Sequence, residues 1–245
     1  MQQVRRVRRA ALLALTLLSA CAAADPSSGG TPTVRPSGSG VFGAYLTGKV
    51  ALSQGNADAA ANAFLRALAA RPNDPELRQQ AFFAALLAGR SEAVQLARQL
   101  PDNQMAVLVL GDEAAKSGRW AEAERQFRAL PRQGLTQLLQ PLLIAWVQQG
   151  DGRTDAALAT LRPLVEGQRF RGLFALHAGM IADLANRPAD AARYYRIAQT
   201  EMPDSNLRLT QVLASWQTRT GHPADAQRLL ANLVAAAPDM SIAVP

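Results

Sequence analysis

Small and bulky apolar residues recur along this chain with a period of about 34 residues. The small residue of each copy is an alanine, at Ala123, Ala157, Ala191 and Ala226. Successive alanines are 34, 34 and 35 residues apart. A bulky residue follows each of them four positions later, at Phe127, Leu161, Tyr195 and Leu230. Because residues four apart share one face of a helix, the pattern predicts helices that pack closely through these pairs.

A turn residue precedes each of these alanines by five positions. The four turn residues are Gly118, Gly152, Asn186 and Gly221. Glycine and asparagine tolerate the left-handed backbone that ends many helices. Pro188 and Pro223 follow two of these turns, where a proline can begin a helix without losing a hydrogen bond. No stretch alternates with a period of two, so the sequence predicts an all-helical fold built from helix pairs.

The residues that carry this period resemble the tetratricopeptide-repeat family. The first copy matches the family pattern at Gly48, Ala51, Gly55, Ala60, Phe64, Ala67 and Pro72. The fifth copy matches it at Gly179, Ala182, Asn186, Ala191, Tyr195, Ala198 and Pro203. The second and fourth copies match less well, and the second is short in its turn and tail. The resemblance covers residues 41–239 and implies a solenoid of about six helix-turn-helix repeats.

The first twenty residues have the pattern of an export signal. Four arginines lie within residues 1–9, and a mostly apolar run over residues 10–20 follows them. This run is too short to span a bilayer, so we interpret residues 1–20 as a signal peptide. The tetrad Leu18-Ser19-Ala20-Cys21 resembles a bacterial lipobox, which implies cleavage before Cys21 and attachment of lipid to it. Cys21 is the only cysteine of the 245 residues.

Residues 21–40 are expected to form the lipidated cysteine and a flexible linker. Ser, Gly, Pro and Thr dominate this stretch, which shows no hydrophobic period. The resemblance to lipoproteins without Asp after the cysteine favours the outer membrane, because Ala22 occupies that position. We therefore expect a lipid-anchored protein of the bacterial cell envelope that faces the periplasm. The repeat domain is expected over residues 41–239, and residues 240–245 form a C-terminal tail.

Charge and composition argue against two classes of function. The formal charge of +7 falls to +3 without the four arginines of the signal, and no basic stripe is interleaved with aromatic residues. A nucleic-acid partner is therefore not predicted. The two histidines, His177 and His222, are 45 residues apart. Metal-ligand spacing, a phosphate-binding glycine loop and a nucleophile elbow are all missing, so we predict no enzyme, no metal and no cofactor.

A binding role is expected to come from the first helix of each repeat. In the family these helices line a groove, and the corresponding positions here are Tyr45, Lys49, Phe83, Leu108, Asp112, Trp146, Met180 and Asp183. This mixture of apolar and charged residues suits a peptide or helix with hydrophobic anchors, although part of the set is expected to pack between repeats. The basic clamp with which some family members hold a carboxyl-terminal peptide is not reproduced at Tyr45 or Asp112.

These features predict a scaffold or adaptor that binds other proteins during assembly or maintenance of an envelope complex. Lipoproteins of this kind resemble pilotins, accessory proteins of barrel assembly and scaffolds for cell-wall enzymes. Two alternatives stay open. The chain could be a structural or secretion-system subunit that associates with itself, since its last predicted helix is rich in Ala and Leu where a polar cap is usual. It could also be the N-terminal fragment of a longer repeat protein or enzyme.

Overall fold

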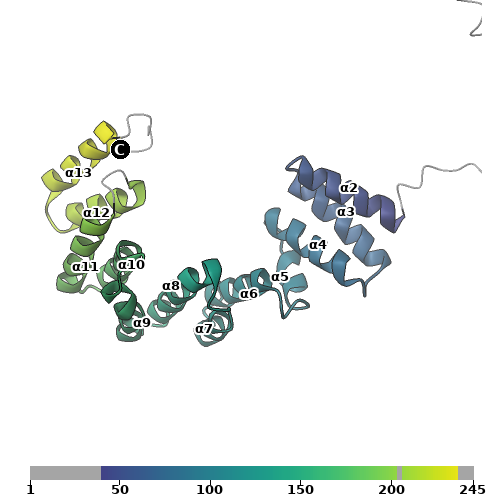
Figure 1. Cartoon of the computed structure of the whole chain (residues 1–245), viewed down its shortest axis with the longest axis horizontal. Coiled ribbons are helices and arrows are strands. Elements are labelled where there is room, and N and C mark those ends of the chain that lie inside the picture. Colours follow the sequence, from purple (N-terminus) through teal and green to yellow (C-terminus); the bar gives the residue numbers. More distant parts are fainter. Residues whose placement is uncertain (1–39, 203–205, 237–245) are drawn as a thin grey trace, which may run out of the picture. The chain divides into compact units, whose positions relative to one another are not determined.

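The computed structural model describes residues 40–202 and 206–236, and these ranges contain twelve α-helices and no strand (Figure 1). The helices are α2 (Val41–Ser53), α3 (Ala57–Ala70), α4 (Pro75–Leu87), α5 (Glu92–Ala97), α6 (Gln104–Lys116), α7 (Trp120–Arg128), α8 (Gly134–Gly150), α9 (Thr154–Glu166), α10 (Arg171–Leu184), α11 (Pro188–Glu201), α12 (Leu207–Arg219) and α13 (Pro223–Ala236). The all-helical prediction is therefore confirmed. The expected signal peptide, Cys21, the linker apart from Gly40, and the C-terminal tail lie outside the described residues.

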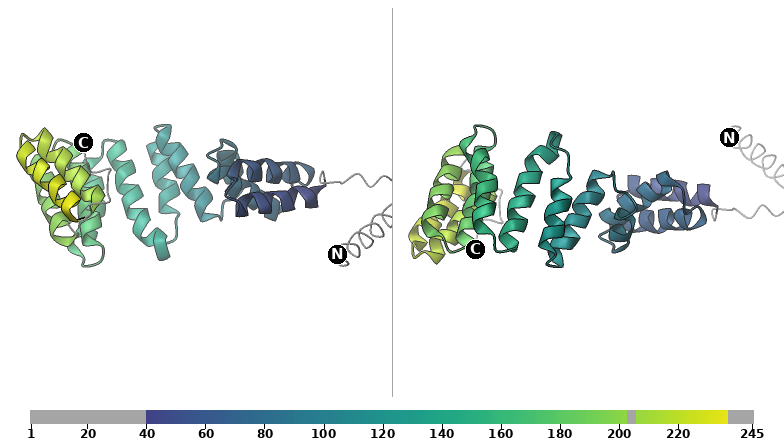
Figure 2. Two further views of the ribbon diagram at one scale, coloured as in Figure 1. Left: turned by 90° about the horizontal axis from the view of Figure 1, so that it is seen from above. Right: turned by 90° about the horizontal axis from the view of Figure 1, so that it is seen from below.

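Consecutive helices form six antiparallel pairs, which agrees with the prediction of about six repeats (Figures 1 and 2). We call the first helix of each pair the A helix and the second the B helix, so the A helices are α2, α4, α6, α8, α10 and α12. Each helix packs mainly on its neighbours in sequence, and α10 also contacts α8 and α12. Among the described residues, none of the helices combines the length and the hydropathy that a membrane span requires.

The turn inside a helix pair needs a residue with positive φ. The predicted turn residues have this conformation, with φ of 70° at Gly118, 75° at Gly152, 55° at Asn186 and 86° at Gly221. Asparagine is one of the few residues other than glycine that adopt this conformation readily. The periodic turn prediction is therefore confirmed.

Three A helices approach their B helix so closely that only glycine fits. A Cβ atom added to Gly48 would lie 2.7 Å from the ring of Phe64, and one added to Gly179 would lie 2.6 Å from the ring of Tyr195. The closest approach is at Gly111, where a Cβ atom would lie 2.3 Å from Cε1 of Phe127. The small and bulky residues of the repeat therefore pack as the pattern predicts.

Two repeats depart from regular geometry. Helix α5 has only six residues, which agrees with the short second copy in the sequence. Pro141 lies inside α8 and Pro163 inside α9, although a proline usually marks a helix boundary. Each proline removes one backbone donor from the helix that contains it.

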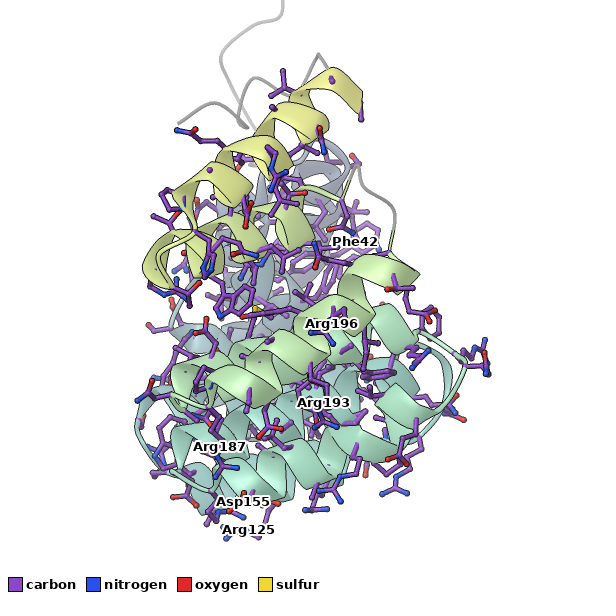
Figure 3. The ribbon with its side chains drawn as sticks, turned by 90° about the vertical axis from the view of Figure 1, so that its left-hand side faces the viewer. Phe42, Arg125, Asp155, Arg187, Arg193 and Arg196 are labelled. Atoms are coloured by element: carbon purple, nitrogen blue, oxygen red, sulfur yellow. The ribbon has the colours of Figure 1, made fainter. Side chains whose placement is uncertain are left out.

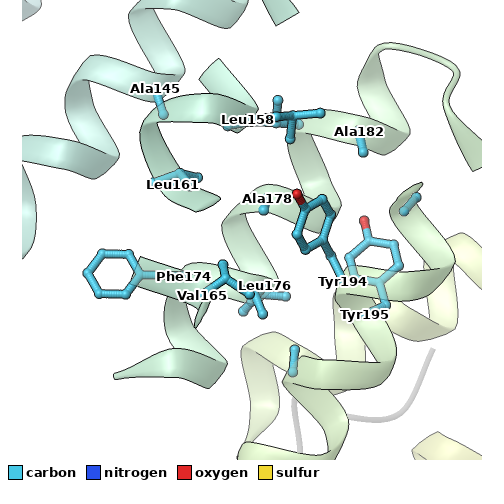
Figure 4. Close-up of a cluster of buried hydrophobic side chains, with 14 of the residues drawn as sticks. Ala145, Leu158, Leu161, Val165, Phe174, Leu176, Ala178, Ala182, Tyr194 and Tyr195 are labelled. Carbon is cyan, nitrogen blue, oxygen red and sulfur yellow. The ribbon is translucent and has the colours of Figure 1, made fainter. Parts of the chain in front are cut away.

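The buried apolar side chains form a series of local clusters instead of one central core. The largest cluster joins α8 to α12 and includes Leu161, Phe174, Ile181 and Tyr195 (Figure 4). A second cluster joins α2 to α6, and a smaller one joins α6, α7 and α8. Contacts between polar side chains also connect neighbouring repeats. One example is the ion pair of Asp155 on α9 with Arg187, just before α11, at 2.5 Å (Figure 3).

The carboxylate of Glu124 on α7 joins the third repeat to the fourth. It accepts hydrogen bonds from Arg128 at 2.5 Å, from Arg153 at 2.6 Å and from Nε2 of the buried Gln148 at 3.0 Å. Burial raises the pKa of Glu124, but these three donors outweigh the burial and lower the pKa to about 2. The folded chain therefore holds this carboxylate ionised well into the acid range.

We expect the stability of the repeat domain to decrease in acid because of Glu124. Between its unfolded pKa, about 4.5, and its folded pKa, the unfolded chain takes up a proton that the folded chain does not. The contribution is complete at neutral pH, is lost as the pH falls towards 2, and amounts to roughly 1–3 kcal/mol. Urea titrations at pH 7 and 3.5 should show a smaller acid loss for Glu124→Gln than for wild type. Glu166 is an exposed carboxylate on α9. If Glu166→Gln reduced the loss of stability between pH 7 and 3.5 as much as Glu124→Gln does, the assignment of this loss to Glu124 would be wrong.

Candidate functional site: the A-helix surface

Exposed apolar side chains are concentrated on the A helices. Within residues 40–202 and 206–236, the large apolar residues that are exposed on A helices are Phe42, Leu46, Val50, Phe83, Leu87, Met105, Leu135 and Leu184. The other exposed large apolar residue in these ranges is Phe170, directly before α10, and no B helix carries one there. Groups of exposed apolar side chains commonly mark interaction sites. The A helices are therefore the candidate binding surface.

Three of the predicted groove residues directly follow a packing glycine of their A helix. Lys49 follows the buried Gly48, Asp112 follows Gly111, and Met180 follows Gly179. One step along a helix turns the side chain by about 100°. The packing residue therefore contacts the B helix, and the next residue lies at or near the surface.

In the first two repeats, the predicted residues divide between packing and exposure. The hydroxyl of Tyr45 donates a hydrogen bond to Oε1 of Glu76 on α4 at 2.8 Å, and its ring packs edge-on against Phe64. The hydrogen bond with Glu76 raises the pKa of the Tyr45 phenol. Lys49 is exposed, and Phe83 keeps 39% of its surface exposed. Tyr45 thus connects two repeats, while Lys49 and Phe83 are accessible to a partner.

In the third repeat, the two predicted residues also differ. Leu108 is half-buried and packs against the cluster formed by α6, α7 and α8. Asp112 is exposed and forms an ion pair with Lys116, one turn further along α6, at 2.6 Å. Leu108 is therefore mainly part of the packing between helices, as expected for some of the predicted set.

The structure brings three of the predicted residues together. Trp146 on α8 and Met180 and Asp183 on α10 line one cavity of about 330 Å³. The rest of its lining comes from α10, α11 and α12, namely Leu184, Tyr195, Arg208, Gln211, Val212, Ser215 and Arg219. We call this space the α8–α10–α12 cavity. It spans the A helices of the fourth, fifth and sixth repeats.

A hydrogen bond to His177 holds the indole of Trp146 in the cavity wall. Nε1 of Trp146 donates to Nδ1 of His177 at 2.9 Å, and the two rings meet edge to face. Because Nδ1 accepts this bond, the neutral imidazole carries its proton on Nε2. Burial, together with nearby Arg208, lowers the pKa of His177 and so favours the neutral form. No role was predicted for His177, and the structure shows that it positions Trp146.

The carboxylate of Asp183 is already occupied by neighbours. Its Oδ2 accepts a hydrogen bond from the hydroxyl of Tyr195 at 3.3 Å and forms an ion pair with Arg219 of the next repeat. Burial and the charge of Asp183 raise the pKa of the Tyr195 phenol, so the phenol stays protonated and donates. Arg219 also donates to Oγ of Ser215 at 2.6 Å. Asp183 therefore joins α10, α11 and α12 at one edge of the cavity.

The sequence prediction missed the residues that α12 contributes to this cavity. Arg208, Gln211, Val212, Ser215 and Arg219 all belong to the sixth repeat, for which no groove residue was predicted. The sequence did contain a signal for these residues, since Ser215 follows Ala214 in the sixth repeat as Met180 follows Gly179 in the fifth.

No group of three His, Cys, Asp or Glu side chains that could hold a metal ion occurs among the residues the structure describes.

Comparisons with known proteins identify the repeats. The family model for the tetratricopeptide repeat matches residues 45–100 and 142–206. The matched residues fall in the first, second, fourth and fifth helix pairs, and the match supports a helical solenoid of such repeats. Proteins built from such repeats mediate protein–protein interactions through extended surfaces. A search of curated proteins finds no match to the sequence.

A comparison with solved structures finds matches to the following three proteins, among others. PilF of Pseudomonas aeruginosa is 15% identical, with 83% of this chain and 94% of PilF covered and a TM-score of 0.50. MamA is 14% identical, with 80% and 90% covered and a TM-score of 0.37. A thermophilic tetratricopeptide-repeat protein of Thermus thermophilus is 20% identical, with 83% and 94% covered and a TM-score of 0.36. The likeness to PilF supports the assignment of the fold.

Proposed function

We propose that this chain is a lipid-anchored adaptor of the bacterial cell envelope that binds other proteins through its A helices. The anchor is Cys21, and the repeat domain faces the periplasm from the outer membrane. The single observation that carries the binding role is the concentration of exposed apolar side chains on the A helices. Phe83 and Leu87, one turn apart on α4, are the clearest example of such a surface.

The proposed anchor is supported by the sequence of residues 1–40. A basic start, a short apolar run and the tetrad ending in Cys21 together favour export and lipid attachment. The acyl chains of a lipidated cysteine would hold the protein stably at a membrane. We expect a radiolabelled fatty acid to be incorporated into the wild-type chain in cells and not into Cys21→Ser. Equal labelling of both would contradict the anchor and leave the binding role open.

The binding role is tested by recovering partners from the envelope. The tagged full-length chain is purified from detergent-solubilised envelopes, and the proteins that accompany it are identified by mass spectrometry. We expect a reproducible partner whose recovery falls several-fold with Cys21→Ser and with the double variant Phe83→Ser/Leu87→Ser. A control, Arg66→Ser, changes an exposed residue on the B helix α3 and should leave recovery unchanged. Recovery of this chain alone would instead favour a self-associating subunit.

A further inference from the structure

The α8–α10–α12 cavity combines an apolar wall with a cationic rim. Trp146 and Met180 supply partly buried apolar surface, Leu184 keeps 69% of its surface exposed, and Val212 lies on the facing helix α12. The ring of Tyr195 lies against Gly179, where the missing side chain leaves it room. Because the bond to His177 holds the indole of Trp146, this wall is formed before any partner binds.

The rim of the cavity carries more positive than negative charge. Its charged lining residues are Arg208, Arg219 and Asp183. Asp183 already accepts from Tyr195 and pairs with Arg219, so its charge is largely balanced within the protein. Arg208 is exposed at the first turn of α12. Its positive charge contributes to the lowered pKa of His177, so the two side chains are close enough to interact. An anionic group would therefore be attracted to this rim.

We propose that the α8–α10–α12 cavity binds a protein segment in which an apolar side chain stands next to a carboxylate. The apolar side chain packs against Trp146, Met180 and Leu184, and the carboxylate binds the guanidinium of Arg208. The volume of about 330 Å³ is within the range of sites that bury a small group with a few polar contacts. The proposal deepens the proposed adaptor function, on which it rests, by naming the chemistry of the partner.

Charge complementarity selects this partner over a neutral or basic one. A guanidinium matches the geometry of a carboxylate and binds it with charge-assisted hydrogen bonds. A lysine or arginine of a partner would meet a like charge at Arg208, since the charge of Arg219 is balanced by Asp183. An amide would keep the shape of the carboxylate but lose its charge. The identity of one partner residue should therefore control binding at this site.

The test uses four labelled peptides of equal length in a glycine–serine frame. They carry at their centre phenylalanine followed by aspartate, phenylalanine followed by asparagine, phenylalanine followed by lysine, or serine followed by aspartate. Binding to the full-length chain in detergent is measured by fluorescence anisotropy at low and at physiological salt. We expect the phenylalanine–aspartate peptide to bind at least about tenfold more tightly than each of the others, which corresponds to about 1.4 kcal/mol.

Two matched variants locate the binding site. Arg208→Gln should weaken binding of the phenylalanine–aspartate peptide about tenfold and bring its affinity close to that of the asparagine peptide. Arg196→Gln changes an exposed arginine on the B helix α11 and should leave both affinities unchanged (Figure 3). Circular dichroism is used to check that both variants fold. Met180→Ala should weaken the phenylalanine–aspartate and phenylalanine–asparagine peptides equally, because it removes only apolar contact.

Several outcomes would overturn this assignment. Equal binding of the aspartate and asparagine peptides, unchanged discrimination in Arg208→Gln, or no binding of any peptide would each exclude the proposed partner chemistry. The envelope purification separates this failure from failure of the adaptor function. If a partner is recovered and lost with Phe83→Ser/Leu87→Ser while the peptides fail, the adaptor function stands and the chemistry proposed for this cavity is wrong.

Discussion

Replacing Gly111 with alanine is expected to destabilise the repeat domain by about 1–3 kcal/mol, because the added methyl group overpacks a tight helix contact. The new Cβ atom would lie 2.3 Å from Cε1 of Phe127, which is buried and has little room to move. In an open helix position the same change would stabilise by up to about 1 kcal/mol. The steric penalty therefore outweighs the gain in helix propensity, and the net change in the free energy of unfolding is a loss. Urea unfolding followed by circular dichroism measures the effect.

The variant Phe127→Leu provides the control for Gly111→Ala. In Phe127→Leu the ring that causes the overlap is gone, so adding Gly111→Ala there should cost little or nothing beyond the first change. Equivalent changes at Gly48 and Gly179 should also destabilise, but less, because a Cβ atom there would lie 2.7 Å and 2.6 Å from its nearest ring atom. A stabilising effect of Gly111→Ala would show that the two helices are not packed as described.

Replacing Gln140 with leucine is expected to cost about 2–3 kcal/mol, because buried carbonyl groups would lose their donor. Nε2 of Gln140, on α8, lies 3.1, 3.2 and 2.7 Å from the carbonyl oxygens of Phe127, Arg128 and Leu130. These carbonyls lie at and just beyond the end of α7, where a helix runs short of backbone donors, although the Phe127 carbonyl also accepts from the Leu130 N–H at 3.2 Å. The side chain of Gln140, in the fourth repeat, thus caps the C-terminal end of the B helix of the third repeat.

Thermal and urea unfolding of Gln140→Leu measure this cost. Gln137→Leu, an exposed change three residues earlier on α8, controls for the effect of leucine on the helix and should stay within about 0.5 kcal/mol of wild type. Gln140→Glu should be as damaging as Gln140→Leu, because a carboxylate cannot donate to the carbonyls. If Gln140→Leu unfolds like wild type, these hydrogen bonds contribute nothing net to stability.

Much of the fold could be predicted because its determinants repeat locally. The turn residues Gly118 and Asn186 are recognisable from their spacing alone, since each acts within its own helix pair. The short α5 was also apparent from the shift in register. Pro141 and Pro163 had no such signal, because only packing against neighbouring helices makes a proline tolerable inside α8 and α9.

The candidate site was predicted only in part because its contacts join distant repeats. Trp146, Met180 and Asp183 were predicted from the groove positions that the resemblance to the repeat family implies, and they do come together in one cavity. The partners of these residues could not be predicted. The bond from Trp146 to His177 joins residues 31 apart, and the pair of Asp183 with Arg219 joins residues 36 apart. Such pairs depend on side-chain rotamers that no periodic pattern specifies.

The alternation of packing and surface residues along each A helix also bears on how this protein can diverge. Gly179 must stay small for the fold, whereas its neighbour Met180 contributes to the cavity wall. A substitution at the second position changes what is recognised and leaves the helix contact intact. Each repeat can therefore acquire a new preference independently, and relatives of this chain could share one scaffold while binding unrelated partners.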